Sequence, residues 1–516
     1  MLLQFLLGQL VFPQLGLLYA AYLLWAGLLM VLGRHLADTL GLARLADVLA
    51  AGVALGAMMG AAAALVQWLG VADRVPWVFP KLGGSAYGNL GQANHHAHYS
   101  WLGIASLLYL RGRRHLSRSL LWLLILPIAF GSVLSGARSV FIYPLVLLAA
   151  MAWLRIREPH GPAPSLLADA VLLLPAAIAL SFVGAWATPQ LPGLAVALGL
   201  MPSGDSGAVV AGARLFESVS GISARLEIGR SAWSAFAGQP WLGQGVGNYA
   251  WASFVAASGH TGDDAFMVSE NAHNFVLQIM AEFGGPAAAI VVLALGVWAM
   301  QFLRQPWRLE QFWCGAVLGI GLVHALLEYP LWYAYFLGPT ALLLGAAGTG
   351  RAIGLPGRRA AVYLLVIACG GAVFLANLRA DYLTIEAAKN RPLAAHPDRE
   401  RAWRTTVDQL LELHRESLLS PWALLSIANL AEPGRQLAAD RADLCERAIR
   451  FVPARLLVTR CAMQMAIAGR DADAKTLIRS VLHAFPAERA DTAGELAKGA
   501  REFPEIAPLR GLSLGK

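Results

Sequence analysis

The chain has 516 residues, of which 57% are hydrophobic and only 14% are charged, with a formal net charge of +8. Soluble domains carry about 25% charged residues, so this composition excludes an ordinary soluble protein and indicates an integral membrane protein. The basic residues gather in short loops between apolar stretches, as in the cytoplasmic loops of membrane proteins, so the positive charge does not indicate nucleic-acid binding.

Apolar stretches of spanning length recur from the N-terminus to about residue 378. A helical span needs about 20 mainly apolar residues, and these stretches lack the alternation of barrel strands. We therefore predict an all-α, polytopic membrane protein. The predicted spans are a short one at 1–12, then 14–33, 46–70, 95–111, 119–135, 139–155, 166–186, 285–303, 312–329, 333–349 and 360–378.

Basic loops predict the orientation of these spans, because arginine and lysine are enriched on the cytoplasmic side. Five basic connections fall on one side when the spans are counted: Arg34 with Arg44, 111–118, 155–158, 304–308 and 350–359. The other side, the periplasm of a Gram-negative cell, then receives 71–94, 136–138, 187–284, 328–333 and everything after 378. We predict a multi-pass protein of the bacterial inner membrane.

This layout divides the chain into four regions: transmembrane helices at 1–186, a large periplasmic loop at 187–284, further transmembrane helices at 285–378, and a periplasmic helical domain at 379–516. The loop is too long for a plain connection, and ordered loops of this length are usually functional. The last region has the pattern of degenerate tetratricopeptide-type helix pairs, with an irregular helical domain as the alternative. Its Cys445 and Cys461 can form a disulfide outside the cytoplasm or remain free thiols.

The first cluster of polar residues on the predicted periplasmic side is "GNLGQANHHAHYSW". It places Gln92, Asn94, His95, His96 and His98 at the mouth of a span. Polar groups at membrane depth usually face a cavity or a partner group. His95 and His98 are three residues apart and can share a helix face, but all three histidines cannot. A cavity lining is therefore favoured over a metal site.

Two arginine-containing clusters follow. Arg138 in "SGARS" lies at a span end, where a snorkelling side chain is the alternative, although the predicted side disfavours positive charge. Arg225 and Arg230 in "SARLEIGRSAW" lie on a predicted amphipathic helix, whose solvated face is the alternative, more so for Arg230. The closely spaced glycines of the next stretch, "PWLGQGVGNY", follow no predicted strand, which excludes a dinucleotide fingerprint.

The fourth cluster is "SENAHNFVLQ". We predict that Ser269 caps a helix over 271–283, with Glu270 in its first turn. The cap does not require His273, which is therefore a candidate for catalysis or ligand binding. Further on, "HALLEYPLWYAYF" puts Glu328 beside a set of aromatic residues; an interfacial girdle explains the rings but not the acid.

Two arginines, a histidine and an acid on one side of a membrane protein suggest a reaction on a polyanionic lipid. Arginine binds phosphate through a planar fork and stays charged at any working pH. The sequence has no P-loop and no DxD-like pair facing a likely nucleotide-sugar site, so a lipid diphosphate is favoured as the donor. Guanidinium groups can neutralise the developing charge without a metal ion or other cofactor, and a histidine can accept the proton of an attacking hydroxyl.

These motifs resemble those of the bacterial O-oligosaccharyltransferases that glycosylate pilins and other exported proteins, in one superfamily with O-antigen ligases and polymerases. The similar stretches lie between about 83 and 340: "GNLGQANHHAHY", "SGARS", "SARLEIGRSAW…PWLGQGVGNY", "ENAHNFVLQIMAEFG" and "HALLEYPLWYAYFLG". The resemblance implies a helical fold of the GT-C glycosyltransferase type. It also implies transfer of a glycan en bloc from undecaprenyl diphosphate to serine or threonine hydroxyls of an exported protein, with inversion and without metal.

The resemblance also implies roles for individual residues. His273 corresponds to the essential histidine, as base or diphosphate ligand, and Arg138 and Arg225 to the arginines that bind the lipid diphosphate. Where the family pattern has a tryptophan after the helix arginine, this sequence has Gly229, so Arg230 is the alternative to Arg225. Six further polar residues support the site: Glu270, Asn271 and Asn274 around the histidine, and Gln92, Asn94 and Glu328 as the lining of a cavity.

Three other functions remain as alternatives. An O-antigen ligase uses the same donor but a sugar of the lipid A-core as acceptor, and the C-terminal helical domain argues mildly against it because a helical array suits a protein acceptor. A glycan polymerase is the third candidate. A transporter predicts internal repeats and polar groups near the bilayer midplane; the sequence shows no such repeat, and its polar clusters gather at one interface.

Overall fold

The computed structural model describes residues 1–516 except 82, 160, 192–209, 212–219, 260–265, 351–356, 392–397 and 514–516. Its regular elements are all helices, and the described residues contain no strand. Seven of the described helices are long and apolar enough to cross a membrane. The predicted class, a polytopic helical membrane protein, is confirmed.

The helices follow the predicted spans closely. Up to residue 389 they are α1 (Leu2–Leu6), α2 (Pro13–Leu40), α3 (Leu42–Trp68), α4 (Ala93–Gly112), α5 (Arg118–Val133), α6 (Tyr143–Arg157), α7 (Ala163–Ala187), α10 (Ser220–Gly238), α11 (Tyr249–Gly259), α12 (Phe275–Arg304), α13 (Leu309–Leu327), α14 (Ala334–Ala346) and α15 (Gly357–Lys389). The short 3-10 helices η2 (Arg138–Phe141) and η4 (Pro330–Trp332) precede α6 and α14.

The predicted span at 1–12 is wrong. Only the five residues of α1 are helical there, far fewer than the roughly 20 that a span needs. The side-chain amide of Gln4 in this helix donates to the carbonyl oxygens of Leu242 and Glu282, both at 2.7 Å. The apolar N-terminus is thus fixed by a polar contact to a distant loop, which its hydropathy alone does not show.

The chain forms two compact units, and each is discontinuous in sequence. Unit 1 comprises Met1–Leu24, Ser223–Leu293 and Gly354–Lys516. Unit 2 comprises Trp25–Ile222 and Ala294–Ile353.

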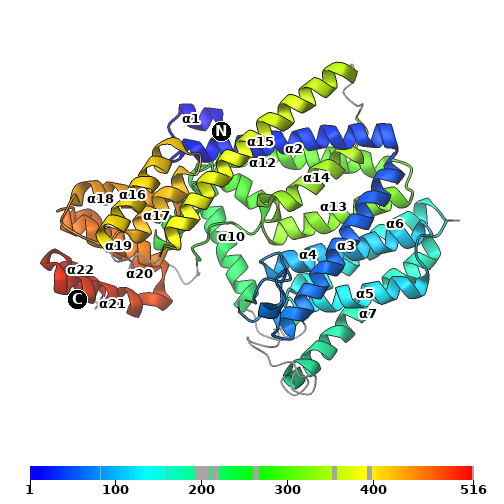
Figure 1. The fold of residues 1–516 in the computed structure, drawn as a ribbon, viewed down its shortest axis with the longest axis horizontal. Helices are drawn as coiled ribbons and strands as arrows, with labels where there is room; N and C mark the ends of the chain where they lie inside the picture. The colour runs from blue at the N-terminus through cyan, green and yellow to red at the C-terminus, as the bar shows by residue number, and fades with distance from the viewer. Residues whose placement is uncertain are drawn as a thin grey trace. The chain divides into compact units, whose positions relative to one another are not determined.

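Small residues pack the helices of unit 2. Alanines recur every three or four residues along one face of α3 and are all buried: Ala46, Ala50, Ala54, Ala57, Ala61 and Ala64. A Cβ at Gly103 of α4 would lie 2.2 Å from the Cβ of Ala57, so only glycine permits this approach. Helices α3, α4 and α5 lie side by side (Figure 1). Close backbone approach through small residues is typical of membrane helices, whose association gains little from apolar burial.

The basic connections of unit 2 meet at one end of its helices. Arg157 donates to the carbonyl of Gln305 at 3.2 Å, and the Gln305 amide donates to that of Ala347 at 2.9 Å. Arg34 in turn donates to the carbonyl of Gly348 at 2.5 Å. These contacts confirm that these predicted loops share a side. Most of the predicted loop at 350–359 lies outside the described residues, and the absolute orientation stays a prediction.

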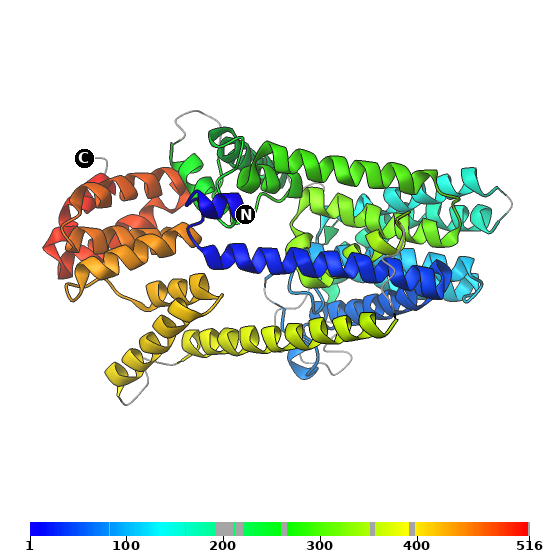
Figure 2. The ribbon, with the colours of Figure 1, turned by 90° about the horizontal axis from the view of Figure 1, so that it is seen from above.

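The C-terminal region of unit 1 is a set of amphipathic helices. They are α16 (Arg399–Glu416), α17 (Ser420–Leu430), α18 (Ala438–Phe451), α19 (Arg455–Ile467), α20 (Asp471–Ala484), α21 (Arg489–Glu502) and α22 (Ala507–Ser513). From α16 to α20 each helix packs against the next, and α21 packs against α22 (Figure 2, orange to red). The region is helical as expected, while its limits as a separate domain and its relation to tetratricopeptide repeats stay predictions.

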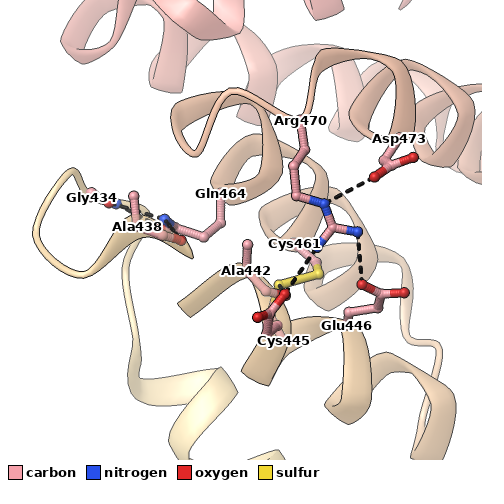
Figure 3. The surroundings of a disulfide bond; sticks show 10 residues. Gly434, Ala438, Ala442, Cys445, Glu446, Cys461, Gln464, Arg470 and Asp473 are labelled. Atoms are coloured by element: carbon pink, nitrogen blue, oxygen red, sulfur yellow. Dashed lines mark hydrogen bonds and ion pairs between the residues drawn. A yellow bond between two sulfur atoms is a disulfide. The ribbon is translucent and has the colours of Figure 1, made fainter. Parts of the chain in front are cut away.

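A disulfide between Cys445 and Cys461 joins α18 to α19 (Figure 3). Beside it, the Arg470 guanidinium binds the carboxylates of Glu446 and Asp473, each at 2.9 Å. These hydrogen bonds raise the pKa of Arg470 above its usual value. Of the two states that the sequence left open for these cysteines, the structure has the disulfide.

Candidate functional site

The segment around His273 is a loop that leads into α12. The helix begins at Phe275, and the Asn274 side chain caps it by accepting from the backbone N–H groups of Val276 at 3.0 Å and Leu277 at 3.1 Å. The predicted Ser269 cap and helix start at 271 are therefore wrong. The Ser269 hydroxyl instead donates to the Asn271 carbonyl at 2.7 Å and closes a local turn.

His273 has a left-handed backbone, with φ of +51°. This conformation costs an L-residue roughly 1–2 kcal/mol, although histidine adopts it more often than most residues. It persists because both flanks are fixed. The Ala272 N–H donates to the Gln278 side chain at 2.6 Å, and Asn274 is held by its cap. The imidazole is half-buried, and the neighbouring Glu270 is exposed.

A buried polar chain stands behind this loop. Besides binding the Ala272 N–H, the Gln278 side chain donates through Nε2 to Glu282 Oε1 at 3.1 Å. The same carboxylate oxygen accepts from the Gly247 N–H at 3.1 Å. Gln278 and Glu282 are 3% and 2% exposed, so both groups depend on these partners. These hydrogen bonds hold the His273 loop, α12 and the loop at 240–248 in one arrangement.

Sequence reasoning missed Gln278 and Glu282 as site residues. Both lie among apolar residues near the start of α12, four residues apart and hence on one face. A polar pair at this spacing in a membrane segment is a functional signal.

The glycine-rich loop at 240–248 packs on a break in α12. Gly284 interrupts the helix with φ of +84°, and a Cβ there would lie 2.3 Å from the Trp241 carbonyl oxygen. A Cβ at Gly243 would meet the backbone of Glu282 at 2.3 Å. The N–H groups of Gln244 and Gly245 donate to the carbonyls that the break exposes, at 2.8 and 3.1 Å. The glycines thus serve backbone-to-backbone docking.

Helix α10 carries Arg225, which is half-buried, and Arg230, which is exposed. Shared partners connect this helix to the His273 loop, because Ser231 of α10 and Ser253 of α11 both donate to the Met267 carbonyl, at 3.0 and 3.1 Å. The Ser253 hydroxyl also accepts from the Ser269 N–H at 3.0 Å.

Tyr249 adds a further contact between α11 and α10. Its hydroxyl donates to the Ile228 carbonyl at 3.4 Å. Burial raises the pKa of Tyr249 above its usual value, so the hydroxyl remains a donor. Six of the predicted site residues lie in the Ser223–Leu293 segment of unit 1: Arg225, Arg230, Glu270, Asn271, His273 and Asn274.

The other predicted site residues belong to unit 2. Arg138 begins η2, directly after a turn in which Gly136 has φ of +72°, and its side chain is half-buried. Asn94 Nδ2 donates to Glu328 Oε1 at 2.7 Å, so the structure brings together two residues that are 234 positions apart. Glu328 is 3% exposed, and Gln92 is half-buried at the start of α4.

Three buried imidazoles lie close to this pair. His95 and His98 share a face of α4, as predicted, and both pack near His324, with ring centroids 5.6 and 4.5 Å away. The His95 and His324 Nδ1 atoms lie 3.0 Å from the hydroxyls of Tyr335 and Tyr143. Within the described parts of the chain, no group of three or more His, Cys, Asp or Glu side chains is arranged to hold a metal ion.

Comparisons with known proteins agree with this architecture. Residues 119–292 match the family model for O-antigen ligase, and residues 312–497 match the model for the C-terminal part of a virulence factor membrane-bound polymerase. The chain is also 29% identical over 334 residues to the General O-oligosaccharyltransferase of Acinetobacter baylyi (strain ATCC 33305 / BD413 / ADP1). These parts of the chain are therefore similar to O-antigen ligases, membrane-bound polymerases and an O-oligosaccharyltransferase.

The matched regions contain most of the residues described above. The O-antigen ligase match includes Arg138, Arg225 and His273, and the polymerase match includes Glu328. The alignment with the oligosaccharyltransferase covers 64% of this chain and 56% of that relative, so it spans little more than half of the relative's length. No solved structure matches this chain.

Proposed function

We propose that this protein is an O-oligosaccharyltransferase that moves a glycan en bloc from undecaprenyl diphosphate to serine or threonine hydroxyls of exported proteins. The observation that carries this proposal is the His273 loop, a half-exposed imidazole on a left-handed backbone fixed from behind by the buried Gln278–Glu282 chain. It lies inside the O-antigen ligase match, in a chain similar to a General O-oligosaccharyltransferase.

The proposed reaction is a single displacement at the anomeric carbon. The acceptor hydroxyl oxygen forms the new C–O bond while the bond from that carbon to the diphosphate oxygen breaks, so the configuration inverts. His273 accepts the hydroxyl proton, and the electron pair leaves with undecaprenyl diphosphate. Arg138 and Arg225, with Arg230 as the alternative, stabilise the negative charge of the leaving group, and no metal ion is needed for this.

Two observations support a periplasmic site in the inner membrane. The Cys445–Cys461 disulfide suits an oxidising compartment, since cytosolic thiols are kept reduced. The basic connections meet at one end of unit 2, as cytoplasmic loops do. Alkylation of free thiols in whole cells tests whether the C-terminal region is periplasmic. In the periplasm Cys445 and Cys461 stay bridged, so they should react with the alkylating reagent only after a reductant is added.

The function is tested in a deletion strain complemented with the wild-type gene. We expect complementation to restore glycans on at least one exported protein, measured by mass spectrometry of the periplasmic and surface fractions. The His273→Ala variant is expected to restore none. Unchanged glycoproteins in the deletion strain would contradict the proposal.

The same strain separates the two other candidates that the family matches favour. An O-antigen ligase, favoured by the match at 119–292, predicts loss of long-chain lipopolysaccharide with free lipid-linked glycan accumulating. A polymerase, favoured by the match at 312–497, predicts glycans shortened to a single repeat. Gel analysis of lipopolysaccharide from the same cultures distinguishes both from protein glycosylation.

A further inference from the structure

Unit 1 contains a cavity of about 310 Å³ that none of the predicted site residues lines. Its wall is formed by the N-terminal turn, the loop at 239–248, the start of α11 and the end of α18. The polar and aromatic residues of this wall are Gln9, Gln239, Gln244, Asn248, Trp251 and Arg450. The volume is at the lower end of the range for small-ligand pockets, about 300–1,000 Å³.

Side-chain hydrogen bonds to the backbone fix the wall of this cavity. Asn248 Nδ2 donates to the carbonyls of Gln9 at 3.0 Å and Gln244 at 2.7 Å. The Gln244 amide donates to the Ala235 carbonyl of α10 at 2.6 Å. Gly247 of the same loop donates to Glu282, so the loop that lines the cavity also contacts the polar chain behind His273.

The cavity offers unused hydrogen-bonding capacity and a positive charge. Gln9 Oε1 is buried, and it has no hydrogen-bond partner among the residues that the structure describes. The Arg450 side chain is 45% exposed, and the carboxylate of Glu446 lies 3.9 Å from its guanidinium, beyond hydrogen-bonding distance. An exposed pair of this kind contributes little to stability, so Arg450 can exchange it for a ligand group.

The surroundings of Trp251 bear on the class of ligand. A sugar ring would need an open indole face for stacking. Phe254 already packs on the Trp251 ring at 5.2 Å, and the Arg450 guanidinium lies over it at 5.9 Å. The amides of Gln9 and Gln239 remain, and amides can both donate and accept, as an extended peptide backbone requires.

We propose that this cavity binds the polypeptide acceptor, as a docking site for a segment next to the glycosylated residue. The amides pair with its backbone, and Arg450 binds a carboxylate or a carbonyl oxygen of that segment. Arg450 comes from the C-terminal helical domain, and arrays of packed helices commonly present binding surfaces. This inference rests on the proposed transfer to proteins and gives that domain a role in acceptor recognition.

The test uses the full-length enzyme in detergent or lipid, its lipid-linked glycan, and the exported protein that the wild-type enzyme glycosylates in cells. We expect Arg450→Glu and Gln9→Leu to raise the KM for this protein about tenfold and to leave kcat and the KM for the lipid-linked glycan unchanged. Arg447→Glu is the matched control, because Arg447 lies on the same helix, is exposed and does not line the cavity. A photo-crosslinker at residue 239 should capture the acceptor protein.

Two results would overturn the inference. A rise in the KM for the lipid-linked glycan would make the cavity a sugar-binding subsite. Unchanged kinetics in both variants would show that no substrate binds there. Failure of the proposed function is distinguishable from either result, because the wild-type enzyme would then glycosylate no exported protein.

Discussion

Two regions of this protein hold histidines in different surroundings, one a single histidine on a loop and the other a buried cluster. The His273 loop of unit 1 presents a half-exposed imidazole on a left-handed backbone. The buried histidine cluster of unit 2, formed by His95, His98 and His324, lies on helices and is at most 3% exposed. Its rings pack against one another and against tyrosine and phenylalanine rings.

This difference in accessibility bears on which histidine can react with a substrate. A group that accepts a proton from a substrate must reach it, and His273 is accessible and held in place by its neighbours. The buried cluster connects α4, α6, α13 and α14 through tyrosine hydroxyls and ring contacts, in a place without solvent access. Both regions are equally conspicuous in sequence, so local composition does not distinguish them.

The largest effect is expected from His273→Asn. Asparagine tolerates the left-handed backbone, so the variant should fold with an unchanged melting temperature. It lacks the imidazole, and loss of a general base typically costs 10²- to 10⁴-fold in rate. Glycan transfer measured with purified enzyme and lipid-linked donor checks this. Transfer at the wild-type rate would show that His273 takes no part in the chemistry and that the two regions do not differ in function.

The second largest effect is expected from Gln278, whose hydrogen bonds hold the His273 loop in place. Gln278→Met removes both hydrogen bonds of the amide and leaves the Ala272 N–H and Glu282 without them, which destabilises by about 1–3 kcal/mol. We expect kcat to fall about tenfold, with both KM values nearly unchanged, because His273 loses its fixed position. Gln409→Met, at an exposed position of α16, is the control. A lowered melting temperature with normal kcat would show a purely structural role.

In unit 2, the hydrogen bond between Asn94 and Glu328 can be tested by the thermal stability of two variants. Asn94→Leu removes the amide donor from a buried carboxylate and should lower stability by about 1–3 kcal/mol. Glu328→Gln keeps an oxygen that can accept from Asn94, so its melting temperature should stay closer to that of the wild type. Thermal unfolding of the two variants in the same detergent measures this order, and the reverse order would contradict the assigned contact.

The smallest effect is expected from His98→Leu. In the part of the chain that the structure describes, neither ring nitrogen of His98 has a hydrogen-bond partner, so an apolar side chain loses no such bond. We expect an unchanged or slightly higher melting temperature and transfer within about threefold of wild type. A loss as large as that of His273→Asn would place the buried cluster in the reaction.

The sequence predicted the helices well, because long apolar runs bounded by basic loops leave a membrane protein few alternatives. It failed where a local rule competes with a tertiary contact. Residues 1–12 are apolar enough for a span, yet Gln4 fixes them to the loop at 240–248. Ser269 fits the pattern of a cap, but the backbone at His273 is left-handed and Asn274 caps the helix instead.

By itself, the sequence determined the class of protein, the side shared by the basic loops and the motifs that resemble the superfamily, because hydropathy, charge and residue type are local properties. Only the tertiary structure decided which polar residues act together. The contacts from Ala272 through Gln278 and Glu282 to Gly247, and from Asn94 to Glu328, depend on backbone breaks and helix packing. The contacts of Glu282 with Gly247 and of Asn94 with Glu328 join residues 35 and 234 positions apart, and burial makes such partners necessary.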